Sequence, residues 1–167
     1  GINAEYGDLY QMSFQKITSF SVDHTKINKG LYVSRIDGDI VTYDMRMVKP
    51  NTAPFLENAG LHSFEHLFAT YVRNSNFTGD IVYVGPMGCR TGFYFLVQRM
   101  THQQVIQLLK ETMLFISNFE GELPGNSEEE CGNYLDHDVA QAKHYAQSYL
   151  DVIADWTPEM MDYRFQK

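Results

Sequence analysis

The alternation of apolar and polar residues predicts a β-hairpin in the first third of the chain. Residues 31–36 (LYVSRI) are typical of a strand, and Asp37-Gly38-Asp39 is a tight-turn signal. Along residues 41–47 the two kinds of side chain alternate, which places them on opposite faces of a second strand. The apolar face holds Val41, Tyr43, Met45 and Met47, and the polar face holds Thr42, Asp44 and Arg46.

Three later segments have the apolar spacing of helices. In residues 61–73, apolar side chains recur at intervals of three and four. Thr101 and Gln104 form a capping box, which opens a helix that continues to about residue 118. Residues 138–153 repeat the helical spacing.

Two short strands and two loops complete the pattern. Residues 80–84 and 93–98 are expected to be strands, with a glycine-containing turn at 85–89 between them. Residues 120–130 combine Gly, Pro and consecutive glutamates, so we expect a solvated loop. The order of elements predicts an α+β fold in which helices pack on a largely antiparallel sheet.

Composition narrows the class of protein. A chain of 167 residues with 44% hydrophobic residues has the length and apolar content of one folded domain. A net charge of −8 argues against a nucleic-acid partner, because a protein that binds the phosphate backbone needs a basic surface. No apolar run has the roughly 20 residues of a membrane span, and the start does not resemble a signal peptide. With only two cysteines, we expect a cytoplasmic protein with reduced thiols and no membrane partner.

The first residues do not follow the pattern of the rest. Residues 1–11 lack a starting Met and any clear periodicity, and Met12 is a plausible native start. We interpret residues 1–11 as a remnant of an expression tag and residues 12–167 as a single domain, with a genuine extension as the alternative.

The motif HxxEH on the first predicted helix carries the strongest chemical signal. His62, Glu65 and His66 share a helical face because a helix turns about 100° per residue. Two imidazoles are half of a metal site, and the glutamate could act as a base. A thiolate from Cys131 could complete a His2Cys set that leaves one position open, as catalytic sites do. The alternatives are two histidines hydrogen-bonded within a helix, and a glutamate that only orients one of them.

Three other residues carry weaker signals. Cys89 lies in a glycine-rich turn (GPMGCRTG) where the backbone can approach a ligand, although most free cysteines are simply buried. A histidine near the N-terminus, such as His24, is usually a surface side chain or one with ordinary hydrogen-bond partners, and an arginine on a strand, such as Arg46, is usually solvated.

Five segments resemble, in order and spacing, motifs of the S-ribosylhomocysteine lyase (LuxS) family. They are SFSVDH at residues 19–24, YDMRMVKPN at 43–51, LHSFEHLFA at 61–69, GPMGCRTGFY at 85–94 and ECGNY at 130–134. HxxEH alone would be unspecific, but five ordered motifs are specific. The resemblance covers the chain from about Lys16 to Ile153.

The resemblance implies an enzyme, a carbon–sulfur lyase of the methyl cycle. It would cleave S-ribosylhomocysteine to homocysteine and 4,5-dihydroxy-2,3-pentanedione, the precursor of the quorum-sensing signal autoinducer-2, by two carbonyl shifts and a β-elimination. One divalent metal per subunit is implied, with Fe2+ expected and Zn2+ or Co2+ able to substitute. The family is a homodimer with its sites at the subunit interface.

The matching motifs also imply roles for particular residues, with the metal site on a central helix. The metal ligands would be His62, His66 and Cys131, together with a water. Glu65 and Cys89 would be the acid/base pair. The substrate would be bound by Ser19, His24 and Arg46.

The chain departs from the family pattern at two places. Residues 82–85 (VYVG) stand where many members carry an Ile-Asp-Ile-Ser run, so side-chain contacts from that aspartate and serine are lost. Val48 replaces a cysteine that is common there.

Two other classes of function share parts of this pattern. A metallopeptidase of the inverted-zincin type also carries HxxEH, but a carboxylate commonly completes its site. A metal or redox sensor would have a closed site with four protein ligands, and removing its metal would unfold it. The lone Cys131 ligand and the second thiol of Cys89 favour the lyase.

Overall fold

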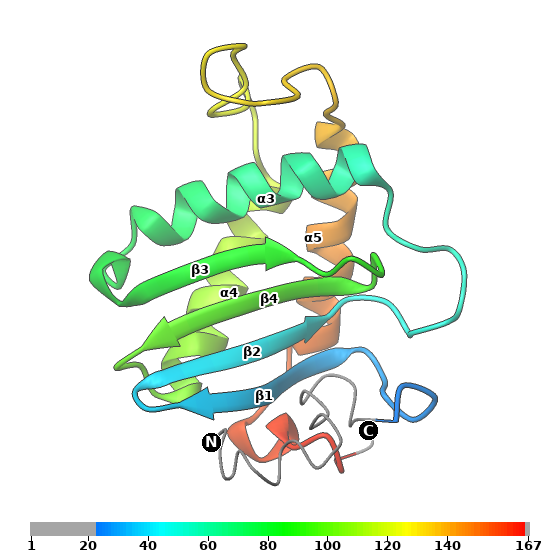
Figure 1. Cartoon of the computed structure of the whole chain (residues 1–167), viewed down its shortest axis with the longest axis vertical. Coiled ribbons are helices and arrows are strands. Elements are labelled where there is room, and N and C mark those ends of the chain that lie inside the picture. The colour runs from blue at the N-terminus through cyan, green and yellow to red at the C-terminus, as the bar shows by residue number, and fades with distance from the viewer. Residues whose placement is uncertain (1–22, 166–167) are drawn as a thin grey trace, which may run out of the picture.

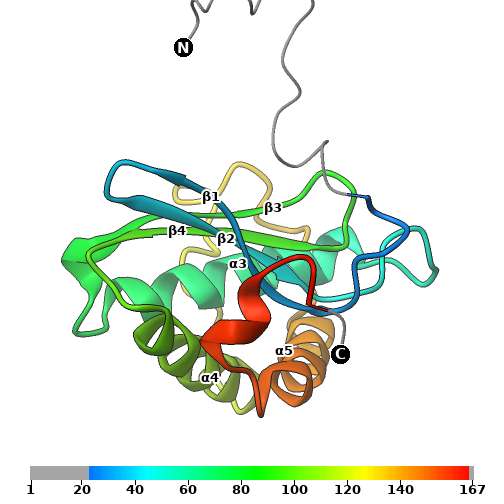
Figure 2. The same cartoon turned by 90° about the horizontal axis from the view of Figure 1, so that it is seen from below.

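Residues 23–165 are described by a computed structural model. In this part of the chain, three helices cover one face of an antiparallel sheet whose strand order is β1-β2-β4-β3 (Figures 1 and 2). The predicted α+β class, with helices on an antiparallel sheet, is confirmed. The strands are β1 (Gly30–Asp37), β2 (Ile40–Arg46), β3 (Ile81–Pro86) and β4 (Gly92–Gln98), and the helices are α3 (Asn58–Arg73), α4 (His102–Ser117) and α5 (Val139–Ile153). The 3-10 turns η1 (Thr78–Asp80) and η2 (Pro158–Met161) complete the order.

The predicted hairpin is formed by β1 and β2. Asp37 pairs with Ile40 across the turn, and Gly38 has a φ of 60°, a left-handed conformation that favours glycine. In this register Leu31 lies opposite Met45.

Aromatic packing fixes α3 on the sheet. Phe64 and Phe68 are fully buried, and their rings lie 4.9 Å from Phe93 and 5.3 Å from Phe95, respectively. Burial of each such side chain contributes about 1.5–3 kcal/mol. Because these phenylalanines point to the sheet, the stripe with His62 and His66 points away from it.

The chain end covers the outer strand. The Trp156 indole donates to the carbonyl of Leu31, and the Tyr149 hydroxyl donates to the carbonyl of Gly30, both at 2.8 Å. A Cβ on Gly30 would lie 2.4 Å from the Trp156 ring, so only glycine fits there. The start of β1 is thereby held by one side chain from α5 and one from the residues that follow it.

The remaining helix signals also hold. Thr101 and Gln104 form the predicted capping box of α4, and Asp138 accepts from the amide of Gln141 at the start of α5. Among the described residues, no helix combines the length and the apolarity that crossing a membrane requires.

Buried tyrosines make the fold sensitive to base. Burial raises the pKa of Tyr32 and of Tyr43 to about 12, and burial followed by the charge of Asp44 raises the pKa of Tyr149 well above its usual value. Unfolded tyrosines ionise near pH 10, about two units lower. The stability contributed by these neutral phenols is therefore complete below about pH 10 and is lost as the pH rises toward 12.

We expect the free energy of unfolding, measured with urea at several pH values, to fall steeply above about pH 10. Tyr149→Phe should make the slope shallower, since one titrating group is removed. Tyr83→Phe is the control, because the Tyr83 side chain is exposed. An equal effect of both variants on the slope would contradict this origin of the sensitivity.

Candidate metal and catalytic site

The two histidines of HxxEH meet a long connection between α4 and α5. The connection rises past α3 and returns to the start of α5 (Figure 1). His62 and His66 stand on consecutive turns of α3, with ring centroids 4.7 Å apart. Cys131 comes from the connection, held by a hydrogen bond from its amide to the carbonyl of Ser127. Its Sγ lies 3.3 Å from His62 Nε2 and 3.9 Å from His66 Nε2.

Backbone carbonyls of the connection fix the tautomers of both histidines. Nδ1 of His62 lies 2.7 Å from the carbonyl oxygen of Asp136, and Nδ1 of His66 lies 2.9 Å from that of Pro124. A carbonyl can only accept, so each Nδ1 carries the proton. Each Nε2 is left with a lone pair directed toward Cys131, which is the usual arrangement of metal-binding histidines.

A third histidine completes the cluster. The ring of His137 stacks on that of His62 at 3.9 Å, and its Nε2 lies 4.0 Å from the sulfur of Cys131. Burial, followed by the neighbouring His62 and His66, lowers the pKa of His137 to about 4, so the ring is neutral near pH 7. Sequence reasoning missed His137. Its position directly before Asp138, the N-cap of α5, could have signalled that it is held close to α3.

The donor set fits a divalent transition metal. One donor atom from each of His62, His66, Cys131 and His137 lies within 4.8 Å of the others. In a tetrahedral zinc site, bonds of about 2.0–2.1 Å to nitrogen and 2.3 Å to sulfur separate the two donors by about 3.6 Å. The distances from the Cys131 sulfur to His62 and His66 lie on either side of this value. Imidazole with thiolate suits zinc and ferrous iron.

Glu65 and the turn that carries Cys89 border the same cavity. The cavity has a volume of about 440 Å³ and is lined by Asn58, Leu61, His62, Glu65, Pro86, Met87, Gly88 and Arg90. Glu65 lies on α3 between the two histidines. Cys89 is exposed, in the turn between β3 and β4. The cavity therefore has a carboxylate on one wall and the turn that carries a thiol on the other.

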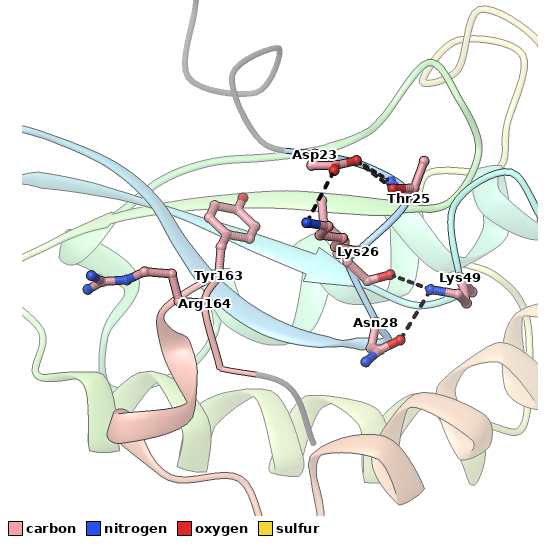
Figure 3. A pocket seen from close by; sticks show the side chains of 8 residues that line it. Asp23, Thr25, Lys26, Asn28, Lys49, Tyr163 and Arg164 are labelled. Carbon is pink, nitrogen blue, oxygen red and sulfur yellow. Dashed lines mark hydrogen bonds and ion pairs between the residues drawn. The ribbon is translucent and has the colours of Figure 1, made fainter.

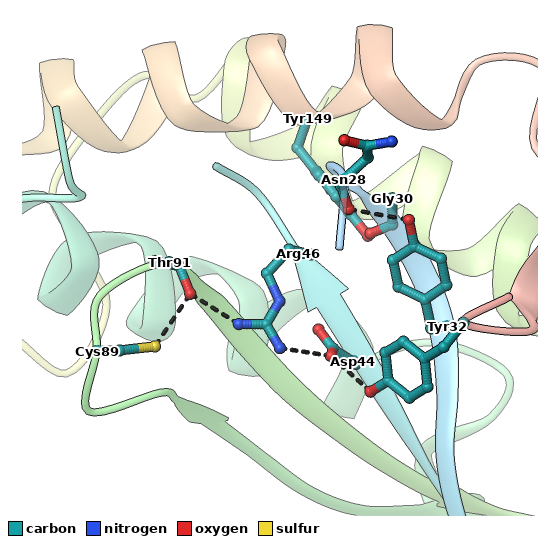
Figure 4. A network of polar contacts seen from close by, with 9 residues as sticks. Asn28, Gly30, Tyr32, Asp44, Arg46, Cys89, Thr91 and Tyr149 are labelled. Atoms are coloured by element: carbon teal, nitrogen blue, oxygen red, sulfur yellow. Dashed lines mark hydrogen bonds and ion pairs between the residues drawn. The ribbon is translucent and has the colours of Figure 1, made fainter. Parts of the chain in front are cut away.

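A buried polar chain leads from the turn into the sheet (Figure 4). Arg46 donates to the hydroxyl of Thr91 at 2.9 Å, and that hydroxyl lies 3.0 Å from the sulfur of Cys89. Arg46 is also paired with Asp44 at 2.6 Å, and the two side chains are 3% and 1% exposed. The ordinary expectation that Arg46 would be solvated is therefore wrong. Because a guanidinium can only donate, Thr91 accepts from Arg46, and either the Thr91 hydroxyl or the Cys89 thiol can donate in the contact between them.

The ion pair keeps both of its charges in a buried place. Burial alone would lower the pKa of Arg46, but the charge and hydrogen bond of Asp44 more than offset it, and the pKa is raised. Tyr163, from the chain end, donates to the same Asp44 oxygen at 2.6 Å and stacks on Tyr32. Burial and then Asp44 raise the pKa of Tyr163 far above its usual value. Within residues 23–165, Asp44 Oδ1 and Arg46 Nε are buried without a hydrogen-bond partner.

Of the predicted substrate-binding residues, His24 and Arg46 belong to the described part of the chain. Ser19 lies outside the described residues, as do residues 1–11. His24 lies in the loop before β1, and its neighbours Asp23 and Thr25 line a different cavity of about 630 Å³, beside Lys49 and Tyr163 (Figure 3).

Comparison with known proteins gives a consistent result. The sequence model of the family described as S-Ribosylhomocysteinase (LuxS) matches residues 17–160. A protein of Finegoldia magna is 44% identical over 153 residues, covering 89% of this chain and 97% of its own. One from Porphyromonas gingivalis is 45% identical over 151 residues, covering 87% and 95%. One from Borrelia garinii subsp. bavariensis is 43% identical over 155 residues, covering 89% and 99%. All three are named S-ribosylhomocysteine lyase.

The bond from Tyr163 to Asp44 should contribute measurably to stability. Tyr163→Phe removes a hydrogen bond to a charged, buried group, which costs about 1.5–3 kcal/mol of unfolding free energy. Urea unfolding at neutral pH measures this, with the exposed Tyr83→Phe as the matched control. A loss no larger than that of the control would mean that Asp44 does not depend on Tyr163.

Proposed function

The chain belongs to the S-ribosylhomocysteinase (LuxS) family, and we propose that it cleaves S-ribosylhomocysteine to homocysteine and 4,5-dihydroxy-2,3-pentanedione. The observation that carries this proposal is the convergence on one cavity of His62, Glu65 and the turn that bears Cys89. Cys131 and His66 stand beside His62, so a metal set and an acid/base set share one place.

We assign the metal to His62, His66 and Cys131. Their Nε2 atoms and the sulfur fit one divalent ion, which we expect to be Fe2+, with Zn2+ or Co2+ as substitutes. When bound, the ion would supply Lewis-acid stabilisation of negative charge that develops on a sugar oxygen.

Glu65 and Cys89 would move the protons. The carbon–sulfur bond can break by β-elimination only when a ketone stands at C3 of the open-chain sugar. The aldehyde must therefore shift from C1 to C2 and then to C3, and each shift transfers a proton between neighbouring carbons. Removal of the C4 proton then expels homocysteine from C5. Glu65 on one wall of the cavity and Cys89 on the turn that forms the other wall would serve these transfers, and no external oxidant is required.

The Arg46–Thr91 pair supports Cys89 as a base. Arg46 donates to the Thr91 hydroxyl and holds it 3.0 Å from the Cys89 sulfur, where it would donate its proton to a sulfur that has lost its own. The sulfur therefore lies beside a hydroxyl and near a buried positive charge, on the turn that borders the cavity.

Several further features are part of the proposal. Arg46, His24 and Ser19 would bind the substrate, and the protein would be a homodimer in which His24 and Ser19 act on the site of the other subunit. Residues 12–167 would form one domain, and the protein would be located in the cytoplasm. The pentanedione that it releases would be the precursor of autoinducer-2.

One observation favours a second candidate function. His137 stands in the same cluster as the three assigned ligands. If it also bound the metal, the site would be closed by four protein ligands, as in a structural site or sensor.

The direct test is homocysteine release from S-ribosylhomocysteine by reduced protein loaded anaerobically with Fe2+ or Co2+. We expect release that depends on metal, with a loss of at least about 100-fold in Glu65→Gln and in Cys89→Ala, the scale of general acid/base catalysis. Both variants should keep their metal, whereas Cys131→Ala should lose it. Gln147→Ala, at an exposed position on α5, is the matched control. Metal-loaded, folded protein that releases no homocysteine would shift the assignment to the closed-site candidate.

The shared site can be tested by mixing two inactive variants, Glu65→Gln and His24→Ala. If His24 acts across subunits, each heterodimer has one site with both native residues, and activity should return. Mixing by unfolding and refolding, followed by ion exchange, isolates the heterodimer. A confirmed heterodimer without activity would place both residues in the same subunit's site.

A further inference from the structure

We propose that His137 is a positioning residue rather than a fourth metal ligand. Ser63 would fix its ring with the proton on Nε2, and that N–H would be donated to the sulfur of Cys131. This inference rests on the metal centre proposed above. His137 would stand beside the ligands, and one position of the metal centre would stay free of protein.

The hydroxyl of Ser63 lies between the start of α5 and the ring of His137. Ser63 is fully buried on α3, and its Oγ lies 2.9 Å from the amide nitrogen of Asp138 and 3.0 Å from Nδ1 of His137. A backbone amide can only donate, so the hydroxyl oxygen accepts from Asp138. The hydroxyl proton then needs an acceptor, since a buried donor without one costs about 1–3 kcal/mol.

The acceptor within reach, among the described residues, is Nδ1 of His137. The amide of Asp138 also donates to the carbonyl of Ala59, which is the carbonyl one helical turn before Ser63. With Nδ1 accepting, the proton of the neutral ring must be on Nε2. A protonated Nε2 has no lone pair for a metal.

The other two histidines have the opposite arrangement. Nδ1 of His62 and Nδ1 of His66 both face carbonyl oxygens, which require a proton on Nδ1 and leave Nε2 free to bind. The partner of Nδ1 therefore distinguishes the three rings. Where Nδ1 faces a carbonyl, Nε2 is free to bind a metal. Where Nδ1 accepts from a hydroxyl, as in His137, Nε2 carries the proton and can donate it.

The geometry at sulfur agrees with this division. His137 Nε2 lies 4.0 Å from Cys131 Sγ, within reach of an N–H donated to sulfur. Stacking on His62 with an interplanar angle of 18° holds the ring in this direction. An N–H donated to a metal-bound thiolate draws electron density from sulfur and tunes the metal. Three protein ligands also leave a position for substrate, which a lyase needs and a closed site lacks.

Nitrogen NMR of the zinc-loaded, 15N-labelled protein reads the tautomers directly. Two-bond 1H–15N correlations should show His137 with a protonated Nε2 and an unprotonated Nδ1, and His62 and His66 with a protonated Nδ1. His144, exposed on α5, serves as the free-histidine reference. A protonated Nδ1 on His137, with Nε2 shifted as in the two ligands, would overturn the proposal.

A second readout uses Co2+ and His137→Gln, whose amide can still donate a hydrogen bond. We expect one Co2+ per chain, an unchanged pattern of visible ligand-field bands, and affinity reduced no more than about 10–100-fold, the usual effect of an outer partner. His137→Ala should in addition shift the sulfur-to-cobalt charge-transfer band, since the N–H to sulfur is lost. His144→Gln is the control. Metal loss equal to that of His62→Gln would make His137 a ligand.

Neither readout requires turnover. A protein that shows the predicted tautomers but no lyase activity would refute the proposed function and leave this inference intact. A protein that is active with a metal-bound His137 would do the reverse.

Discussion

The tie between the amide of Asp138 and α3 is the contact on which the site depends. That single N–H reaches both the carbonyl of Ala59 and the hydroxyl of Ser63, so it joins the start of α5 to the helix that carries HxxEH. Residues 119–138 contain no helix or strand of their own. Fixing their far end therefore determines where the Asp136 carbonyl and the thiol of Cys131 can lie. Without that tie, the entropy of a long loop would oppose a thiolate beside two imidazoles.

Local periodicity predicted most of the elements but only half of the site. Helical spacing was enough to place His62 and His66 together, because two residues on one helix need no tertiary information. Cys131 was proposed as the missing third ligand on its chemistry, and the resemblance to a family added its role as a ligand, since spacing alone cannot bring a distant loop to a helix. His137 was missed because its approach depends on an irregular connection and on a serine from the apolar side of HxxEH, neither of which leaves a periodic signal.

Alternation along β2 correctly separated two faces but not their environments. Asp44 and Arg46 share the polar face, which an isolated hairpin would expose to water. Tyr163, distant in sequence, donates to Asp44, and Thr91 from the neighbouring turn accepts from Arg46. The polar strand face therefore holds a buried charge pair that is linked through Thr91 to the thiol of Cys89. Burial of such a pair lowers the free energy of unfolding unless its hydrogen bonds are satisfied. A catalytic use of the network would explain why the chain keeps the pair.

The carbonyls that orient His62 and His66 belong to the backbone, and no side-chain replacement can delete a backbone carbonyl. Drift in the residues of the connection should therefore leave the basicity of both imidazoles nearly constant. Gly125 is the exception: its φ is 67°, and a Cβ there would touch Nδ1 of His66 at 3.4 Å. Selection on this loop should therefore preserve its backbone conformation more than the identity of its side chains. Gly125 should be its most constrained position.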